Sequence, residues 1–418
     1  MKTITLSATN TPTLPARQRQ RAFVPASSFT ALAKDQRPTV LHFAYSIGGG
    51  GAEAMLVNLV ETLDPAQFRS VVVAINAKPW PHHAQRLRAA GAVLHDLEGT
   101  AFLHRETLAK LRNVLRTERP DIVQTWMHHA DLIGGWAARL AGVRKIVWSI
   151  HCREIHRNHG ESNHKTALFR RALALSSRFI PSRIISCSAA AIEDHAAIAY
   201  PRSKMQWIPN GIDADRFVPD TDAGLDTRAE LRLPPNAPVI GYVGRFHEMK
   251  DLPTFLRAAA ILQTRMPKAH FVFCGGVGVE FNAAEREAFA RIPHRDQVRF
   301  DSFRPDPWRL YPALNVFSLS SRTEACPMTI IEAMSCGVPC VTTDVGDCAR
   351  LLEGVGRVVP PHDPEALANA WEQTLRLDAA ARDGIAKQSR QRVLERFTIA
   401  KAAHQYAETY AQLMEVRK

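Results

Sequence analysis

The sequence lacks any uninterrupted apolar run of the roughly 18 residues that a membrane-spanning helix needs. Its longest apolar stretches, such as 71–77 and 240–243, have the length of strands. The seven cysteines are an odd number, and neither a C-x-x-C pair nor a histidine cluster at zinc spacing accompanies them. These absences argue against a membrane-spanning protein, a disulfide framework and a structural metal, and favour reduced thiols in a cytoplasmic protein.

Acidic residues are unevenly distributed along the 418-residue chain, whose formal net charge is +12. Residues 1–212 contain 27 lysines and arginines against 14 aspartates and glutamates, whereas residues 213–418 contain 26 against 27. A basic first half indicates an anionic partner, and a contribution to solubility alone is the alternative. An acidic membrane surface and a diphosphate-linked lipid are candidates. Nucleic acid is not favoured, because the order of predicted elements contains no known nucleic-acid-binding module.

The periodicity of apolar residues divides the chain into segments. Residues 1–37 are rich in Ser, Thr, Pro and Arg without a helical or strand period, so we expect a flexible leader. From Pro38 onward, short apolar runs alternate with amphipathic segments, among them a predicted helix over 132–141. The alternation stops at 213–238, which is rich in proline and acidic residues and is interpreted as a linker, and then resumes.

This alternation predicts an α/β fold of two doubly wound, Rossmann-like domains, each with a parallel sheet and helices on both faces. The domains should comprise residues 38–212 and 213–390. A C-terminal helix over 391–418 should cross back to the first domain. Since ligands of such sheets bind beyond the carboxyl ends of the strands, the two domains should face one another across a cleft.

Two loops that follow predicted strands suit a phosphorylated ligand. The loop Gly48-Gly-Gly-Gly-Ala-Glu53 opens a helix, where glycines let the backbone approach a phosphate and the helix N-terminus favours its charge. It is not the G-x-G-x-x-G dinucleotide fingerprint, and a tight turn is the alternative. In the second half, Arg245 and Lys250 could grip a diphosphate, one as a planar fork and the other as a point charge. Two solvated surface cations are the alternative for this pair.

A pair of glutamates frames a predicted helix in the second half. Glu324 precedes the helix and Glu332 lies within it, eight positions further on. The backbone N–H groups of residues 326–329 should be unpaired at the helix start. This order suits a sugar hydroxyl, a diphosphate and a ribose along one ligand, whereas an N-terminal acid favoured by the helix dipole plus a surface glutamate is the alternative.

Four segments together resemble the retaining GT-B glycosyltransferases known as group 1 or family 4. They occur in the expected order between about residues 40 and 400, and they are Ile208-Pro-Asn-Gly-Ile-Asp213, Gly244-Arg-x4-Lys250, the E-x7-E segment from Glu324 to Glu332, and Thr343-Asp-Val-Gly346. The resemblance implies a GT-B fold and transfer of a sugar from a nucleotide-sugar donor, UDP- or GDP-linked, without a cofactor or metal.

The resemblance also implies residue roles. Arg245 and Lys250 would neutralise the departing diphosphate. Glu324 would contact the hexose hydroxyls, Glu332 would hold the ribose, and His151 would line the acceptor side near the transferred sugar. Further donor contacts would come from Gly50, Gly51, Asn210 and Gly244 and from the backbone amides of Pro327, Met328 and Thr329.

The expected chemistry passes through an oxocarbenium-like state, with front-face attack and the leaving phosphate accepting the proton of the acceptor. A nucleophilic role for Glu324 is the alternative. The sequence departs from the family pattern at Gly275-Gly-Val-Gly278, where Gly-x-Gly-Pro is common, and at Ala325-Cys326, where a glycine is usual. The second departure changes the predicted hexose pocket and leaves the identity of the sugar open.

Other polar clusters are interpreted as structural. The D-x-D pairs Asp213/Asp215 and Asp220/Asp222 lie in the predicted linker. His128-His-Ala-Asp131 has no third metal ligand at suitable spacing and should line the acceptor cleft. Between residues 151 and 183, by contrast, cations and apolar residues alternate at helical spacing, which predicts a helix that docks on anionic membrane. An ordinary core helix with a solvated cationic side is the alternative.

The sequence thus predicts a cytoplasmic glycosyltransferase, with peripheral association with the inner face of the cytoplasmic membrane as a further expectation. Its acceptor would be a saccharide or a polyprenyl-diphosphate-linked saccharide of a surface polysaccharide. A catalytically inactive scaffold and a nucleotide-sugar epimerase on the same fold are the alternatives. All four charged residues of the predicted donor site are present, which argues against both.

Overall fold

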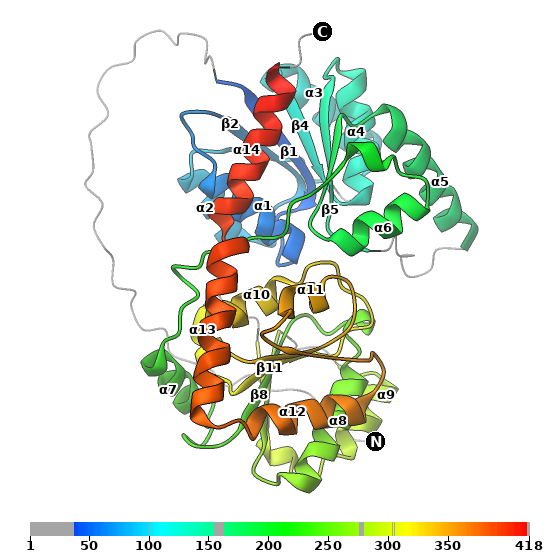
Figure 1. The fold of residues 1–418 in the computed structure, drawn as a ribbon. Coiled ribbons are helices and arrows are strands. Elements are labelled where there is room, and N and C mark those ends of the chain that lie inside the picture. The colour runs from blue at the N-terminus through cyan, green and yellow to red at the C-terminus, as the bar shows by residue number, and fades with distance from the viewer. Residues whose placement is uncertain are drawn as a thin grey trace.

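The computed structural model describes residues 37–99, 101–153, 163–275, 280–302, 304 and 306–415. Two parallel β-sheets, each flanked by helices, form two domains that lie one above the other in Figure 1. This is the predicted α/β architecture. Of the leader predicted over residues 1–37, all but Arg37 lies outside the described residues.

The first domain contains a seven-stranded sheet in the order β3-β2-β1-β4-β5-β6-β7. Its central strands are almost fully buried, as is typical of a parallel sheet covered on both faces. The strands are β1 (Thr39–Ser46), β2 (Arg69–Asn76), β3 (Val93–Asp96), β4 (Ile122–Trp126), β5 (Lys145–Ile150), β6 (Arg183–Ser186) and β7 (Met205–Trp207). The helices are α1 (Gly51–Thr62), α2 (Pro81–Ala89), α3 (Arg105–Glu118), α4 (His128–Leu140), α5 (Asn163–Phe179) and α6 (Ala189–Ala197).

The second domain contains a six-stranded sheet in the order β10-β9-β8-β11-β12-β13. The chain order reverses between β8 and β11, so the carboxyl ends of these two neighbours form the switch point where ligands of doubly wound sheets bind. The strands are β8 (Val239–Val243), β9 (His270–Cys274), β10 (Val298–Asp301), β11 (Val316–Leu319), β12 (Cys340–Thr343) and β13 (Arg357–Val359). The helices are α8 (Leu252–Arg265), α9 (Ala283–Ala290), α10 (Met328–Ser335), α11 (Cys348–Leu352) and α12 (Pro364–Leu375).

The structure differs from the sequence prediction at one helix boundary and inside the predicted linker. Helix α4 begins at His128 rather than at the predicted residue 132. The prediction missed its first turn because polar residues there interrupt the apolar period. The predicted linker 213–238 contains a helix, α7 (Thr221–Glu230), whose N-cap Asp220 accepts a hydrogen bond from the backbone of Ala223 at 2.9 Å. Gly224 suggested a loop, but a Cβ at this position would lie 2.6 Å from the carbonyl oxygen of Pro312, so close packing requires glycine inside this helix.

The last two helices join the domains. Helix α13 (Ala379–Arg396) lies along the second domain, and α14 (Ile399–Glu415) continues onto the first (Figure 1). There the hydroxyl of Tyr410 donates to Gln124 of β4, and the ammonium of Lys145 lies 3.3 Å from the sulfur of Met414. The predicted boundaries at residues 212 and 390 stay a prediction. Along the described residues, no helix combines the length and the apolar character required to cross a membrane.

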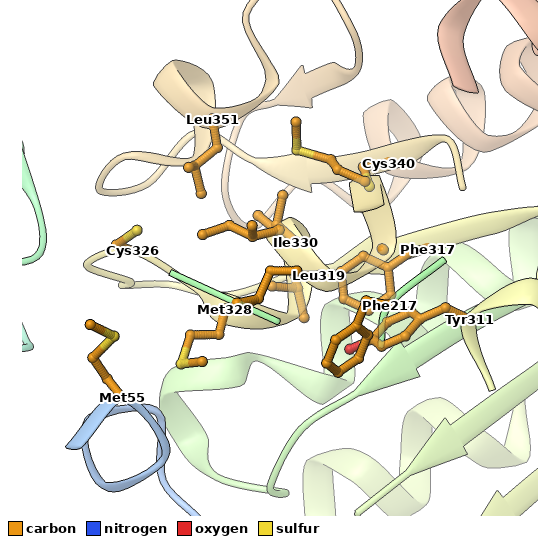
Figure 2. Close-up of a cluster of buried hydrophobic side chains, with 14 of the residues drawn as sticks. Met55, Phe217, Tyr311, Phe317, Leu319, Cys326, Met328, Ile330, Cys340 and Leu351 are labelled. Atoms are coloured by element: carbon orange, nitrogen blue, oxygen red, sulfur yellow. The ribbon is translucent and has the colours of Figure 1, made fainter. Parts of the chain in front are cut away.

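One buried cluster spans both domains. Figure 2 shows Met55 of α1 pointing toward Cys326 and Met328 at the start of α10. All three side chains are buried. The first turns of α1 therefore pack against the segment that carries Glu324, so the glycine loop that precedes α1 lies at the interface of the two domains.

Candidate active site

The two loops at the switch point of the second domain bring Lys250 and Glu324 together. The loop after β8 ends in a short 3₁₀ turn, Glu248–Lys250, and the loop after β11 leads into α10. The ammonium of Lys250 lies 2.5 Å from Oε1 of Glu324, which also accepts a hydrogen bond from the hydroxyl of Ser321 at 2.6 Å. Backbone contacts tie the loops together, since the N–H of Arg322 donates to the carbonyl of Met249 at 2.8 Å.

Gly346 explains why the Thr343-Asp-Val-Gly segment belongs to this site. Its φ of +59° lies in the left-handed region, and a Cβ would lie 2.0 Å from the carbonyl oxygen of Glu324. Only glycine lets the loop after β12 pass this close. The position of the Glu324 backbone therefore depends on a residue more than twenty positions further along the chain.

Arg245 differs from Lys250 in its surroundings. It follows Gly244 at the end of β8, and its side chain is exposed. Within the described ranges its guanidinium forms no ion pair. Gly244 packs back to back against Gly275, since a Cβ on Gly275 would lie 2.7 Å from the Gly244 carbonyl oxygen. The exposed guanidinium is therefore available to an anionic ligand.

Glu332 lies inside α10 and is half-buried. The hydroxyl of Tyr311 donates to its Oε2 at 2.5 Å. Burial raises the pKa of Glu332 to about 7, although the hydrogen bond from Tyr311 opposes this shift. A carboxyl with this pKa can exist as an acid or as a carboxylate near neutral pH, and its charged form is the better acceptor for hydroxyl groups.

The start of α10 corrects one prediction. Pro327 is the N-cap residue and provides no side-chain cap. A proline has no backbone N–H, so it cannot donate to a phosphate as expected. The N–H groups that the first turn offers are those of Met328 and Thr329, and the helix dipole adds to their attraction for an anion.

The glycine loop faces this helix from the first domain. Gly50 is the N-cap of α1 and Gly51 is its first residue, and the loop has no side-chain cap. A Cβ at Gly50 would lie 2.3 Å from a carboxylate oxygen of Glu53, so that side chain folds back over the loop. The ring of Trp80 supports the other side, because a Cβ at Gly49 would lie 2.6 Å from it.

His151 directly follows β5 in the first domain and stacks on Trp126 with ring centroids 5.0 Å apart. Both of its ring nitrogens are buried without a hydrogen-bond partner among the described residues. Burial lowers the pKa of His151 to about 4, and a polar interaction with Asn210 offsets part of that shift. Asn210 also donates from Nδ2 to the carbonyl of Cys326 at 2.8 Å, so it connects His151 with the segment after Glu324.

The polar clusters interpreted as structural behave in two ways. Asp213 accepts from the backbone of residues 215 and 216, and Asp220 caps α7, so the first aspartate of each D-x-D pair stabilises local backbone structure. The prediction that Asp131 lines a cleft is wrong. Asp131 is fully buried and accepts from Thr125 and the Ser149 backbone, and burial raises its pKa well above the usual range.

The adjacent histidines project in different directions, as expected. His129 stacks between Phe102 and Phe169, whereas Nε2 of buried His128 lies 2.8 Å from Nε2 of His195. The contacts of Glu332 with Tyr311 and of Glu324 with Ser321 were missed by the sequence analysis. Neither contact could have been read from the sequence, because the burial of Tyr311 is seen only in the structure, where a buried tyrosine hydroxyl requires a partner.

Comparisons with known proteins agree with this geometry. Residues 49–216 match the family described as Glycosyltransferase Family 4, and residues 237–376 match that described as Glycosyl transferases group 1. The putative glycosyltransferase EpsF of Bacillus subtilis is 26% identical over 82% of this chain and 88% of its own length. The UDP-Gal:alpha-D-GlcNAc-diphosphoundecaprenol alpha-1,3-galactosyltransferase of Escherichia coli is 25% identical over 74% of this chain and 80% of its own length.

The crystal structure of Anabaena Alr3699/HepE in complex with UDP-glucose superimposes with a TM-score of 0.76 and 20% identity. The match covers 90% of this chain and 99% of that one. A sucrose-phosphate synthase of Thermosynechococcus elongatus gives a TM-score of 0.74 at 22% identity, over 91% of this chain and 100% of that one. Two family matches in the expected order and this shared fold show that the chain belongs to the GT-B glycosyltransferases of group 1 and family 4, and that it is a glycosyltransferase.

Proposed function

We propose that this enzyme transfers a hexose, with retention of configuration, from a UDP- or GDP-linked donor to a saccharide acceptor. The observation that carries the proposal is the Lys250–Glu324 pair at the switch point, beside the N-terminus of α10. A cation, a hydroxyl-binding carboxylate and unpaired backbone N–H groups lie in the order in which a nucleotide sugar would need them.

The donor would bind the second domain along this row. Lys250 and the exposed Arg245 would neutralise the diphosphate together with the N–H groups of Met328 and Thr329. Glu324 would accept hydrogen bonds from the hexose and Glu332 from the ribose. Gly50 and Gly51, with Asn210, would close the site from the first domain. The UDP-glucose complex of the structurally similar Anabaena protein supports a nucleotide-sugar donor.

Two observations support retention by front-face attack. An inverting transferase needs a general base whose pKa lies near the operating pH. His151, the titratable group on the acceptor side, has a pKa of about 4 and is a weak base. Oε1 of Glu324 already accepts from Lys250 and Ser321, which disfavours attack by this oxygen as a nucleophile. The leaving diphosphate, stabilised by Lys250 and Arg245, would then accept the proton of the acceptor.

The acceptor would be a saccharide linked to a polyprenyl diphosphate, as part of surface polysaccharide synthesis on the cytoplasmic side of the membrane. The name of the E. coli relative describes a diphosphoundecaprenol-linked acceptor. Another relative, the mannosyltransferase LpsB of Rhizobium meliloti, is described as acting in lipopolysaccharide core biosynthesis; it is 29% identical over 50% of this chain and 60% of its own length.

The outer face of α5 would hold the enzyme against an anionic membrane. Leu168, Leu175 and Phe179 are 69%, 62% and 67% exposed on this helix, which contains no acidic residue. Three arginines of the same helix line a hollow of about 530 Å³, and they are Arg170, Arg171 and Arg178. Apolar side chains among cations are the pattern of helices that lie in the membrane interface.

Donor binding is tested by thermal unfolding with UDP, GDP, UDP-glucose and GDP-mannose. A ligand present at 100 times its Kd should stabilise the folded state by about 2.7 kcal/mol and raise Tm. Slow release of free sugar from the stabilising donor would then distinguish an enzyme from an inactive scaffold. An unchanged Tm with all four compounds would contradict the proposed function.

Membrane docking is tested separately by flotation with vesicles that contain or lack phosphatidylglycerol. Replacing Arg170 and Arg171 with glutamate should reduce binding to anionic vesicles at least tenfold, because each cation near such a surface contributes about 1 kcal/mol. The control replaces the exposed Arg112 and Arg116 of α3 with glutamate, which changes the charge equally on another helix of the same domain. Equal binding of both variants would show that α5 does not dock.

A further inference from the structure

The three-residue segment from Glu324 to Cys326 is held by hydrogen bonds that originate on separate parts of the chain. The carbonyl of Ala325 accepts from the backbone N–H of Asp347 at 2.9 Å. The carbonyl of Cys326 accepts from Asn210, which lies in the crossover between the domains. Any movement of one domain relative to the other therefore acts on the segment that positions Glu324.

Asp347 makes the second connection between the two domains. It follows Gly346 in the second domain, and its carboxylate accepts hydrogen bonds from the N-terminus of α6 in the first. Oδ1 accepts from the hydroxyl of Ser188 and the N–H of Ala190, both at 3.0 Å, and Oδ2 accepts from the N–H of Ala189 at 2.8 Å. A single side chain thus forms three hydrogen bonds between the domains.

These bonds compensate a buried charge. Asp347 is 3% exposed, and it forms no ion pair with any residue that the structure describes. Its negative charge is offset by the unpaired N–H groups and the positive end of the dipole of α6. If the domains separate, these hydrogen bonds are exchanged for weaker net interactions with water, because hydrogen bonds to a charged group are worth more than typical ones, so the contact favours the closed arrangement. Ser188 links this cap to the helix itself, because its hydroxyl oxygen accepts from the N–H of Ala191 at 3.1 Å.

Helix α6 carries the connection to the acceptor side. Nδ1 of His195 lies 2.8 Å from the carbonyl of Ala191, so it is the donor nitrogen and Nε2 is the acceptor for His128. Nδ1 of His128 is then left to accept from the thiol of Cys152, 3.6 Å away. Cys152 is the neighbour of His151. One chain of contacts thus runs from the backbone of Ala325 through Asp347 and α6 to the residue beside His151.

We propose that Asp347 is a positioning residue that closes the cleft by capping a helix of the opposite domain. Its backbone holds the segment after Glu324 while its side chain holds α6. Glu324 reaches its position over the donor sugar only when the acceptor domain is docked on the donor domain. Donor and acceptor sites are thereby completed in one movement.

The test compares Asp347→Ala with Asp363→Ala in the full chain. Asp363 is the N-cap of α12 and accepts from the N–H of Ala366 at 2.8 Å, so it performs the same local function within one domain. Small-angle X-ray scattering without substrate should give a larger radius of gyration for Asp347→Ala than for the wild type, whereas Asp363→Ala should match the wild type. This measurement does not depend on the proposed function.

A kinetic comparison, which does rest on the proposed function, uses the nucleotide sugar that raises Tm. Asp347→Ala should lower kcat/KM about tenfold, because losing hydrogen bonds to a charged group costs roughly one power of ten or more. The KM for the acceptor should rise more than the affinity for the donor nucleotide falls. Asp363→Ala should change neither.

Ser188→Ala gives a milder variant, in case Asp347→Ala folds poorly. It removes one of the three bonds from the first-domain side and should shift the scattering curve in the same direction by less. Scattering curves of Asp347→Ala and Ser188→Ala that superimpose on that of the wild type would overturn the proposal, and Asp347 would be a helix cap like Asp363.

Discussion

The two domains differ in whether their candidate site residues have hydrogen-bond partners. In the second domain two carboxylates are paired, Glu324 with Lys250 and Glu332 with Tyr311, whereas the Arg245 side chain is exposed. In the first domain both ring nitrogens of His151 and Nε2 of His42 are buried without a hydrogen-bond partner among the described residues. Burial lowers the pKa of these histidines to about 4 and about 3. The second domain therefore holds these carboxylates by hydrogen bonds, whereas the first domain keeps these two histidines neutral beside the ring of Trp126.

This difference indicates a division of work. Preorganised charges suit a diphosphate leaving group, since their arrangement needs no reorganisation during the reaction. Neutral rings and unpaired polar atoms suit the uncharged hydroxyl groups of an acceptor saccharide. Part of the excess of basic residues in the first half lies on α5, which contains no acidic residue.

Lys250→Met should have the largest effect of the substitutions considered, on the rate of sugar transfer. It removes a charge that would stabilise the leaving diphosphate and leaves Glu324 without its cation, so kcat should fall about 100- to 1000-fold. The measurement is donor hydrolysis and sugar transfer with the nucleotide sugar that raises Tm. Lys387→Met is the control, because Lys387 pairs with Asp383 at 2.7 Å on the exposed face of α13. If Lys250→Met retains more than about half of the activity, Lys250 does not contact the diphosphate.

Glu332→Gln should weaken donor binding by about 10- to 100-fold, because a hydrogen bond to a charged group is worth roughly 1.5–3 kcal/mol. In the wild type, protonated Glu332 is a poor acceptor for the ribose, so affinity should improve as pH rises through about 7. Calorimetric titration with UDP-glucose between pH 6 and pH 8 measures this, since its diphosphate ester does not titrate there. The same pH dependence in Glu332→Gln would show that another group is responsible.

The fold could be predicted because alternating apolar segments are local features of the sequence. The proximity of Lys250 and Glu324 has a topological reason, since both residues follow strands that become neighbours at the switch point, whereas their roles were predicted from the family resemblance. The role of Asp347 could not be predicted in this way. Its partners lie more than 150 positions away in the sequence. Neither its own segment nor α6 has a residue pattern that predicts a contact between the domains.

Local reasoning also has identifiable failures. The start of α4 was missed because His128 and His129 replace apolar residues in the first turn, although tertiary contacts of their rings stabilise the helix there. The N–H expected from Pro327 was an error of residue chemistry that the sequence alone could have prevented. The role of Asp131, by contrast, could not be found from the sequence, since only its three-dimensional surroundings show that it is a buried structural carboxyl.

His151→Phe tests the difference between the domains through the pH dependence of the unfolding free energy. The folded-state pKa of His151 is depressed to about 4, so between pH 4 and 6.5 the unfolded state binds more protons than the folded state. Stability from this group is present above pH 6.5 and is lost as pH falls. The variant should therefore reduce the acid dependence of the unfolding free energy by at most about 1.4 kcal/mol per pH unit.

Urea unfolding at several pH values measures that slope. Glu332→Gln should change the slope with the opposite sign. Its raised pKa makes the folded state bind more protons between about 4.5 and 7, so stability from Glu332 falls as pH rises through that window. The contrast between the domains would be lost if both variants changed the slope in the same direction.

Tyr311→Phe should have the smallest effect. Its hydroxyl stabilises the carboxylate form of Glu332, so removing it should move the pH midpoint of UDP-glucose binding above about 7. At pH 7 the affinity should fall several-fold and recover at higher pH, because a neutral hydrogen-bond donor to a carboxylate is worth roughly 1–2 kcal/mol. Tyr406→Phe is the control, since the buried Tyr406 hydroxyl has no hydrogen-bond partner among the described residues. An unmoved midpoint in Tyr311→Phe would mean that Glu332 is not the titrating group, and the paired character assigned to the second domain would rest on Lys250 and Glu324 alone.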